Sequence, residues 1–198
     1  MSSEKYTNTL ISFYGSLNYA YKDKYLVEAV LRHEGSTMFG ENNKWGNFPA
    51  VSAGWVLSKE AFMQNAVWVN NLKLRVGYGL TGNHSFGNAP HPFVTLGTGG
   101  YYIYQDGSWH QTYGPSLNPN PDLKWERKKE FNAGVDFGLF GNKLSGSVDY
   151  FQRRTDGLVI KAIVEQPANV ASETLQNVGE LGTNGIELTL SATPIRKG

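Results

Sequence analysis

Two carboxylates and four histidines are the residues of this sequence best suited to catalysis or metal binding. Asp136 and Asp149 flank the connection 141–142. On adjacent strands they could face each other, and such a pair can perform acid–base chemistry. We favour the simpler interpretation that both are solvated charges. The histidines have no metal-like spacing and are scattered over expected loops: His33, His84, His91 and His110. We therefore assign no catalytic or metal-binding residue.

Composition excludes several further classes of site. The sequence has no cysteine, so disulfides, cysteine–zinc sites and thiol catalysis are ruled out. Lys plus Arg number 18 and Asp plus Glu number 17, without a basic cluster, which gives no reason to expect nucleic acid. Gly97-Thr98-Gly99-Gly100 precedes a strand-like stretch instead of a helix, so it is not a nucleotide-binding loop. No cofactor is expected.

A two-residue alternation of apolar and polar side chains runs through most of the chain and predicts an all-β, antiparallel meander. Tilted strands need about 9–11 residues to cross a bilayer, and several of these segments are that long. One face is long and aromatic, and the other mixes Gly, Ser, Thr and Asn with charges, as in a transmembrane barrel with a wet interior. The expected strands are 9–21, 25–32, 51–57, 72–80, 131–139, 144–150 and 186–190.

Connection lengths alternate between short and long, as in outer-membrane barrels with periplasmic turns and extracellular loops. Short connections are expected at 22–24 and 141–142, and long ones at 33–47, 81–92, before 123 and at 162–177. Parity allows either no strand or two strands between 80 and 125, so seven or nine strands are expected. The extra pair would be 92–96 and 101–105, with its turn at 97–100.

The connection 58–71 is the exception, because parity places this long segment on the periplasmic side. Ser58 is expected to cap a short helix there, with Glu60 in its first turn. Tyr19, Tyr21 and Tyr25 surround the nearby short turn and are expected to form the periplasmic aromatic girdle.

Hydropathy and the N-terminal residues leave two interpretations of where the protein is located. No run of about 18 apolar residues exists to form a membrane-spanning helix, and mean hydropathy is −0.39. The first residues carry no apolar secretory segment. The protein is therefore either cytoplasmic or a fragment of a longer precursor, and the strand pattern favours the fragment.

Several motifs occur in a consistent order along the chain. They are Gly40-Glu41-Asn42-Asn43-Lys44-Trp45-Gly46, Phe48-Pro49-Ala50-Val51-Ser52-Ala53-Gly54-Trp55, Asn71-Leu72-Lys73-Leu74-Arg75, Tyr78-Gly79, Thr81-Gly82-Asn83, Asn118-Pro119-Asn120-Pro121-Asp122-Leu123-Lys124-Trp125-Glu126, Asn177-Val178-Gly179-Glu180 and Asn184-Gly185-Ile186-Glu187-Leu188. Together they resemble the barrel of SusC/RagA-type TonB-dependent receptors over nearly the whole chain. The resemblance implies that residues 1–198 are part of a barrel of about 22 strands. No plug domain, signal peptide or terminal barrel strand is recognised.

The resemblance also implies partners and a location. A receptor of this type lies in the outer membrane of a Gram-negative bacterium, surrounded by outer-membrane lipid. It imports oligosaccharides or peptides with a SusD-like surface lipoprotein, driven by TonB through a plug that these residues do not supply.

One group of loop aromatics is the candidate substrate-binding site. Flat aromatic faces suit sugar rings or peptide side chains, although a membrane-edge girdle or packing within the loop would need the same residues. The group comprises Tyr101, Tyr102, Tyr104, Trp109 and Tyr113. Two alternatives to an importer remain: a soluble β-sandwich or barrel that binds glycans, and an adhesin-like structural barrel. A sandwich would bury the apolar strand faces in a core, whereas an importer would expose them as a band about 25 Å tall.

Overall fold

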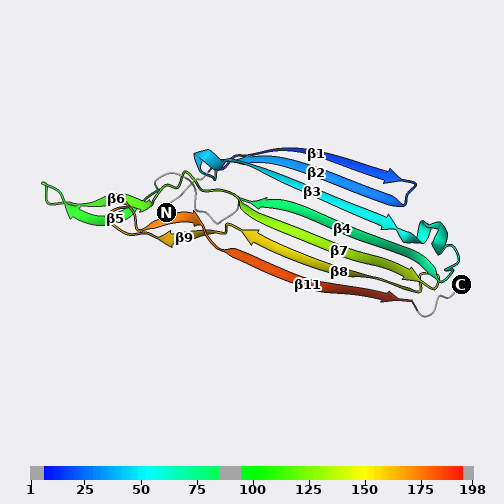
Figure 1. Ribbon diagram of the computed structural model, residues 1–198. Helices are drawn as coiled ribbons and strands as arrows, with labels where there is room; N and C mark the ends of the chain where they lie inside the picture. The colour runs from blue at the N-terminus through cyan, green and yellow to red at the C-terminus, as the bar shows by residue number, and fades with distance from the viewer. Residues whose placement is uncertain (1–6, 85–94, 194–198) are drawn as a thin grey trace.

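A computed structural model describes residues 7–84 and 95–193, and its main element is one antiparallel sheet of seven strands (Figure 1). The strand order is β1-β2-β3-β4-β7-β8-β11, so neighbours in sequence are neighbours in the sheet once two loop hairpins are set aside. The strands are β1 (Leu10–Tyr21), β2 (Tyr25–Ser36), β3 (Trp45–Val56), β4 (Val69–Asn83), β7 (Glu126–Leu139), β8 (Leu144–Asp156) and β11 (Glu180–Ala192). The sheet is open, with β1 and β11 at its edges. The expected meander of seven strands is confirmed.

The register places one continuous row of apolar residues from neighbouring strands on a single face of the sheet. Tyr25 pairs with Trp55, and Trp55 with Leu74. The same row continues through Val135 and Val148 to Leu188. Because side chains alternate along each strand, every second row projects from this same face, which we call the outer face.

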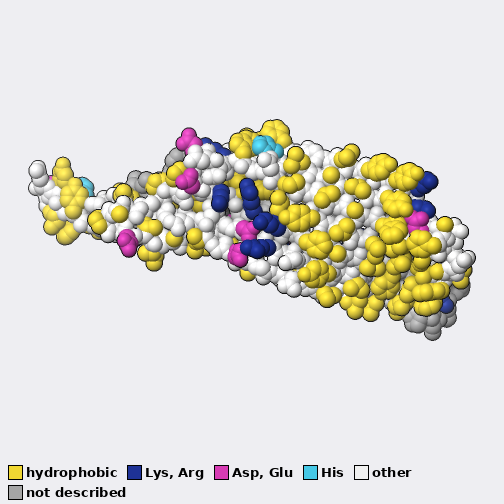
Figure 2. Space-filling view, in the orientation of Figure 1, with side chains coloured by type: hydrophobic (Ala, Val, Ile, Leu, Met, Phe, Trp, Pro, Cys, Tyr) yellow, Lys and Arg dark blue, Asp and Glu magenta, His cyan; other side chains and the backbone are white. Residues whose placement is uncertain are grey.

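No second layer covers the outer face in the described part of the chain. Ile186 on β11 is 73% exposed and Leu17 on β1 is 69% exposed, and Figure 2 shows the apolar side chains as a broad continuous area over the strands. A soluble sandwich would bury these residues against another sheet, so the sandwich alternative is wrong.

Most strands extend beyond their expected limits toward the loop end of the sheet. β3 begins at Trp45 instead of 51. Gly46, Asn47 and Pro49 interrupt the apolar–polar alternation, which hides this part of the strand in the sequence, but all three pair with β2. The connection before β3 is accordingly shorter than the expected 33–47.

Two hairpins lie in the loops beyond the sheet. They are β5 (Thr95–Ile103) with β6 (Trp109–Leu117), and β9 (Val159–Ile163) with β10 (Glu173–Asn177). Figure 1 shows β5 and β6 projecting away from the sheet. The nine-strand alternative is therefore wrong. The glycine run 97–100 lies inside β5, where the register shifts between Thr98 and Tyr101, and the chain reverses farther on. The start of the expected 92–96 strand lies outside the described residues.

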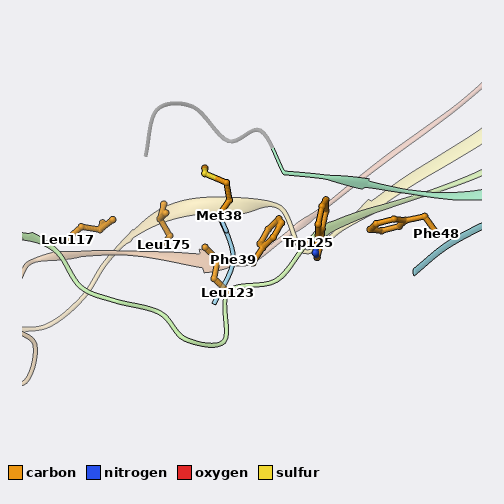
Figure 3. Close-up of a cluster of buried hydrophobic side chains, with 7 residues drawn as sticks. All are labelled: Met38, Phe39, Phe48, Leu117, Leu123, Trp125 and Leu175. Atoms are coloured by element: carbon orange, nitrogen blue, oxygen red, sulfur yellow. The ribbon is translucent and has the colours of Figure 1, made fainter. Parts of the chain in front are cut away.

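The buried core lies between the loops and the end of the sheet instead of under the strands. It consists of seven side chains drawn from five separate segments (Figure 3): Met38, Phe39, Phe48, Leu117, Leu123, Trp125 and Leu175. Phe39 and Trp125 pack with ring centroids 4.4 Å apart, and Phe48 meets Trp125 edge-on at 5.2 Å. This cluster, the loop core, joins the connections into one unit.

The opposite end of the sheet carries the short turns and the connection before β4. That connection contains two 3-10 helices, η2 (Leu57–Lys59) and η3 (Ala61–Met63), and neither has a side-chain cap. The expected helix capped by Ser58 is wrong. Glu60 instead accepts hydrogen bonds from Trp55 Nε1 and Lys24 Nζ, both at 3.1 Å.

Among residues 7–84 and 95–193, no helix combines the length and apolar character needed to span a membrane.

Candidate functional site

Backbone contacts hold the loops around the loop core. Gly40 donates its N–H to the Leu123 carbonyl at 3.0 Å, and Trp125 Nε1 donates to the Lys44 carbonyl at 3.1 Å. A Cβ at Gly40 would collide with the Pro121 carbonyl, so only glycine permits this approach. The connection after β2 and the segment before β7 are therefore fixed to each other.

Asparagine side chains attach the β9–β10 hairpin to the same unit. Asn118, which is buried, donates to the carbonyls of Ala171 and Glu173 and accepts the N–H of Ala171, at 2.6–3.0 Å. Asn177 bonds both backbone groups of Lys124, at 2.9 and 2.7 Å. These amides form hydrogen bonds with backbone groups that lie outside the seven-stranded sheet.

The β5–β6 hairpin turns at residues 104–108. Gly107 has φ +77°, and the Ser108 hydroxyl and N–H donate to Asp106 at 2.6 and 2.9 Å. The hydroxyl bond, followed by the backbone bond, lowers the pKa of the Asp106 carboxyl. His110 Nε2 lies 2.8 Å from Ser108 Oγ. In a catalytic triad the histidine lies between serine and carboxylate, whereas here the serine lies in the middle, so the group is not a nucleophile site.

The hairpin divides the five expected substrate-binding aromatics between its two faces. Tyr102 and Tyr104 share one face with His110, with ring centroids 6.2 Å apart for the two tyrosines. On the other face, alternation along β6 places Trp109 with Tyr113, and cross-strand pairing adds Tyr101. All five are at least half exposed, with Trp109 and Tyr113 at 66%.

The inner face of the sheet carries a charged network around Arg75. Its guanidinium donates twice to Asp136 at 2.7 Å and once to Asp149 at 2.9 Å. Asp136 pairs in register with Ser147 and Asp149 with Gly134, so the two carboxylates are diagonal neighbours on one face. The Arg75–Asp149 bond crosses Gly134, where a Cβ would meet both groups. The expected proximity of the carboxylates is correct, but a guanidinium lies between them.

The histidines occupy separate environments. His33 stacks on Trp45 at 4.7 Å, and its Nδ1 lies 2.7 Å from Asn47 Oδ1. His84 contacts the Trp125 ring, and His91 lies outside the described residues. No three His, Asp or Glu side chains in the described part of the chain group as metal ligands.

Arg75 and the asparagines of the loop unit were missed by reasoning from sequence. Pro119 and Pro121 favour a rigid, non-strand loop, but the groups that this loop contacts are far away in sequence. Nothing in the local pattern identifies Ala171 or Glu173 as the groups that Asn118 binds.

Comparison with known proteins identifies the architecture. The family model described as TonB dependent receptor-like, beta-barrel matches residues 1–194. The TonB-dependent receptor SusC of Bacteroides thetaiotaomicron is 34% identical over 95% of this chain and 19% of its own length. A TonB-dependent receptor of Formosa agariphila is 37% identical over 96% of this chain and 18% of its own. The chain thus spans about a fifth of the length of the relatives it matches.

Solved structures give the same result. The RagAB peptide importer in its open-open state superposes with a TM-score of 0.82 at 28% identity, over 96% of this chain and 20% of that one. The siderophore receptor PirA of Pseudomonas aeruginosa shares the fold, with a TM-score of 0.60 at 14% identity, over 92% of this chain and 31% of that one.

Proposed function

Because the chain belongs to the family of TonB-dependent receptor β-barrels, we propose that it forms seven neighbouring strands in the wall of an outer-membrane importer of the SusC/RagA type. Wall strands need an apolar face toward lipid and a polar face toward the interior. The single exposed apolar face of the seven-stranded sheet is the observation that carries this proposal.

The open edges support a role as part of a larger closed barrel. β1 and β11 each leave a row of backbone N–H and C=O groups without a strand partner in the described sheet. Such groups are costly in lipid, where water cannot satisfy them. In the complete receptor further strands pair with both edges, and the barrel has about 22 strands.

The imported substrate is an oligosaccharide or a peptide, captured with a SusD-like surface lipoprotein and moved by TonB acting on a plug inside the barrel. Similarity to a structure named as a peptide importer supports the peptide class. The polar inner face, including the network around Arg75, faces the plug and the transport path.

The β5–β6 hairpin supplies substrate contacts. Tyr101, Trp109 and Tyr113 present one broad aromatic surface, and Tyr102 and Tyr104 present a second. Aromatic side chains bind flat apolar groups with little loss of conformational entropy.

Two lysine substitutions on β7 test the wall. Val135 lies on the outer face and Asn132 on the inner face. In the full-length receptor, Val135→Lys should destabilise the folded barrel by about 2–4 kcal/mol, the cost of a cation facing the middle of the bilayer. Asn132→Lys should leave the amount of heat-modifiable, folded receptor in the outer membrane near the wild-type level. Equal tolerance of both lysines would contradict the proposal.

Uptake kinetics test the aromatic contacts. The double variant Trp109→Ala, Tyr113→Ala should raise the half-saturating concentration of labelled substrate by roughly tenfold, since each aromatic contact contributes about 0.5–1.5 kcal/mol. Val67, which is 85% exposed at the opposite end of the sheet, provides a control substitution to alanine. Unchanged half-saturation at equal surface abundance would exclude these residues as substrate contacts.

A further inference from the structure

A group of charged residues lies on the outer face where the apolar band ends. Figure 2 shows Lys, Arg, Asp and Glu side chains gathered beside the apolar area, at the loop ends of β7, β8 and β11. The register identifies the outward-facing members of these rows: Arg127, Lys129, Arg154, Asp156 and Glu180. We call these five residues the rim cluster.

The rim cluster directly follows the aromatic edge of the band. Phe131 and Tyr150 contact each other edge-on, with centroids 6.5 Å apart. Lys129 is two residues beyond Phe131 on β7, and the rise of a strand makes that about 7 Å. If Phe131 and Tyr150 contact acyl chains, then Lys129 and Arg154 lie at the depth of lipid headgroups.

Cations outnumber carboxylates in the cluster, three to two. Lys129 Nζ lies 2.6 Å from Asp156 and Arg154 Nε 2.9 Å from it, and Arg154 also pairs with Glu180. Arg127 is exposed and forms no ion pair within the described part of the chain. The cluster therefore has one positive charge in excess.

The cluster is accessible from the membrane side and confined to one part of the wall. Gly82 and Gly182 flank its two rows and add no side chain. In the corresponding rows of β1–β3 the outer positions carry no Lys, Arg, Asp or Glu; they are Gly15, Leu31, Pro49, Phe13, His33 and Asn47. A cationic group beside an apolar face complements a molecule with both an anionic head and acyl chains.

We propose that Arg127, Lys129 and Arg154 bind the phosphate of an outer-leaflet lipid whose acyl chains lie over Phe131 and Tyr150. Arg127 offers an unpaired guanidinium for bidentate contact with phosphate oxygens. Asp156 and Glu180 position the other two cations. This inference rests on the proposed function, because it needs the outer face to contact the membrane.

The test uses the full-length receptor in phosphatidylcholine nanodiscs containing lipid A, and measures the lipid A that binds. Wild-type receptor should bind lipid A more tightly than dephosphorylated lipid A, and millimolar inorganic phosphate should not displace it. Arg127→Gln should weaken binding about fivefold, the effect expected of one cation at an anionic lipid surface. This variant breaks no ion pair of the cluster, so the sheet should stay intact.

A matched pair of triple variants completes the test. Arg127→Gln, Lys129→Gln, Arg154→Gln should weaken binding about a hundredfold. The register places Lys73, Lys128 and Arg153 on the inner face. The variant Lys73→Gln, Lys128→Gln, Arg153→Gln removes the same charge and should retain binding. Equal binding of dephosphorylated lipid A, full displacement by inorganic phosphate, or equal effects of the two triple variants would overturn the inference. These results would leave the importer proposal intact, whereas failure of the wild-type receptor to insert into nanodiscs would overturn that proposal instead.

Discussion

At the level of single residues, several glycines and asparagines allow or form contacts between distant elements. Because Gly134 has no side chain, Arg75 on β4 can reach Asp149 on β8 across the intervening strand β7. Asn118 acts as an extra piece of backbone and bonds both a carbonyl and an N–H of the 171–173 segment. These residues connect elements that are distant in sequence.

Gly134→Ala should separate Arg75 from Asp149 while leaving Arg75 bound to Asp136. Because the ion pair is partly exposed, the expected loss of unfolding free energy is about 1 kcal/mol or less. The measurement is urea unfolding of the full-length receptor in lipid vesicles. Gly182→Ala is the control, since a Cβ there meets no atom within 4 Å. Equal stability of the two variants would show that Gly134 is not needed for the network.

At the scale of elements, the loops form a structured unit with its own core, and the β5–β6 hairpin extends from it. Trp125 is 3% exposed at the centre of this unit and contacts both Phe39 and Phe48. Trp109, on the hairpin, is 66% exposed. Trp125 is thus a packing residue, whereas Trp109, 16 positions earlier, is a surface residue.

Trp125→Ala should lower the free energy of unfolding by about 3–5 kcal/mol, the usual effect of truncating a buried tryptophan. Since the loop core joins several connections, hydrogen exchange should accelerate together in 37–44, 118–125 and 171–177. Trp109→Ala should leave exchange in all three segments unchanged. Acceleration limited to the neighbours of residue 125 would contradict the idea of one joined unit.

The short-turn end of the sheet responds to pH through Glu60. Hydrogen bonds from Trp55, then Tyr25 and Lys24, lower the pKa of this carboxyl from its ordinary value of 4.5. A depressed pKa means that the contact stabilises the fold above the ordinary value and is lost as pH falls through the folded-state pKa. Hydrogen exchange in 57–63 should therefore be constant from pH 7 to about pH 5, after correction for intrinsic rates, and should rise below that. Glu60→Gln should abolish this step; a step that persists in the variant would assign it to another group.

At the scale of the whole molecule, one sheet separates two environments. Its outer face is apolar over the width of seven strands and becomes charged at the rim cluster, and its inner face carries the charged network around Arg75. The hydrophobic core that a soluble domain would place under the sheet is found among the loops instead.

The sheet was accessible to prediction from sequence, and the loops were not. Side chains of a strand alternate with a period of two, so Leu72, Leu74 and Val76 reveal both strand and face locally. The β5–β6 hairpin was misread because Gly97–Gly100 resembles a turn, while the reversal depends on Gly107 and Asp106. The register of this hairpin decides which face carries Tyr102 and which carries Trp109, so the two faces could not be predicted either. The contacts of Asn118 depend on packing between segments that are distant in sequence.

Site-specific fluorescence quenching can show whether the outer face of the sheet contacts lipid. Single substitutions Leu74→Cys, Val135→Cys and Val148→Cys on the outer face, and Asn132→Cys and Ser147→Cys on the inner face, are labelled with a fluorophore in a full-length receptor free of other cysteines. The receptor is reconstituted in vesicles containing brominated lipid. Strong quenching should alternate with strand position, high at the first three sites and low at the other two. Equal quenching at all five sites, or stronger quenching at 132 and 147, would show that the outer face is not the face in contact with lipid.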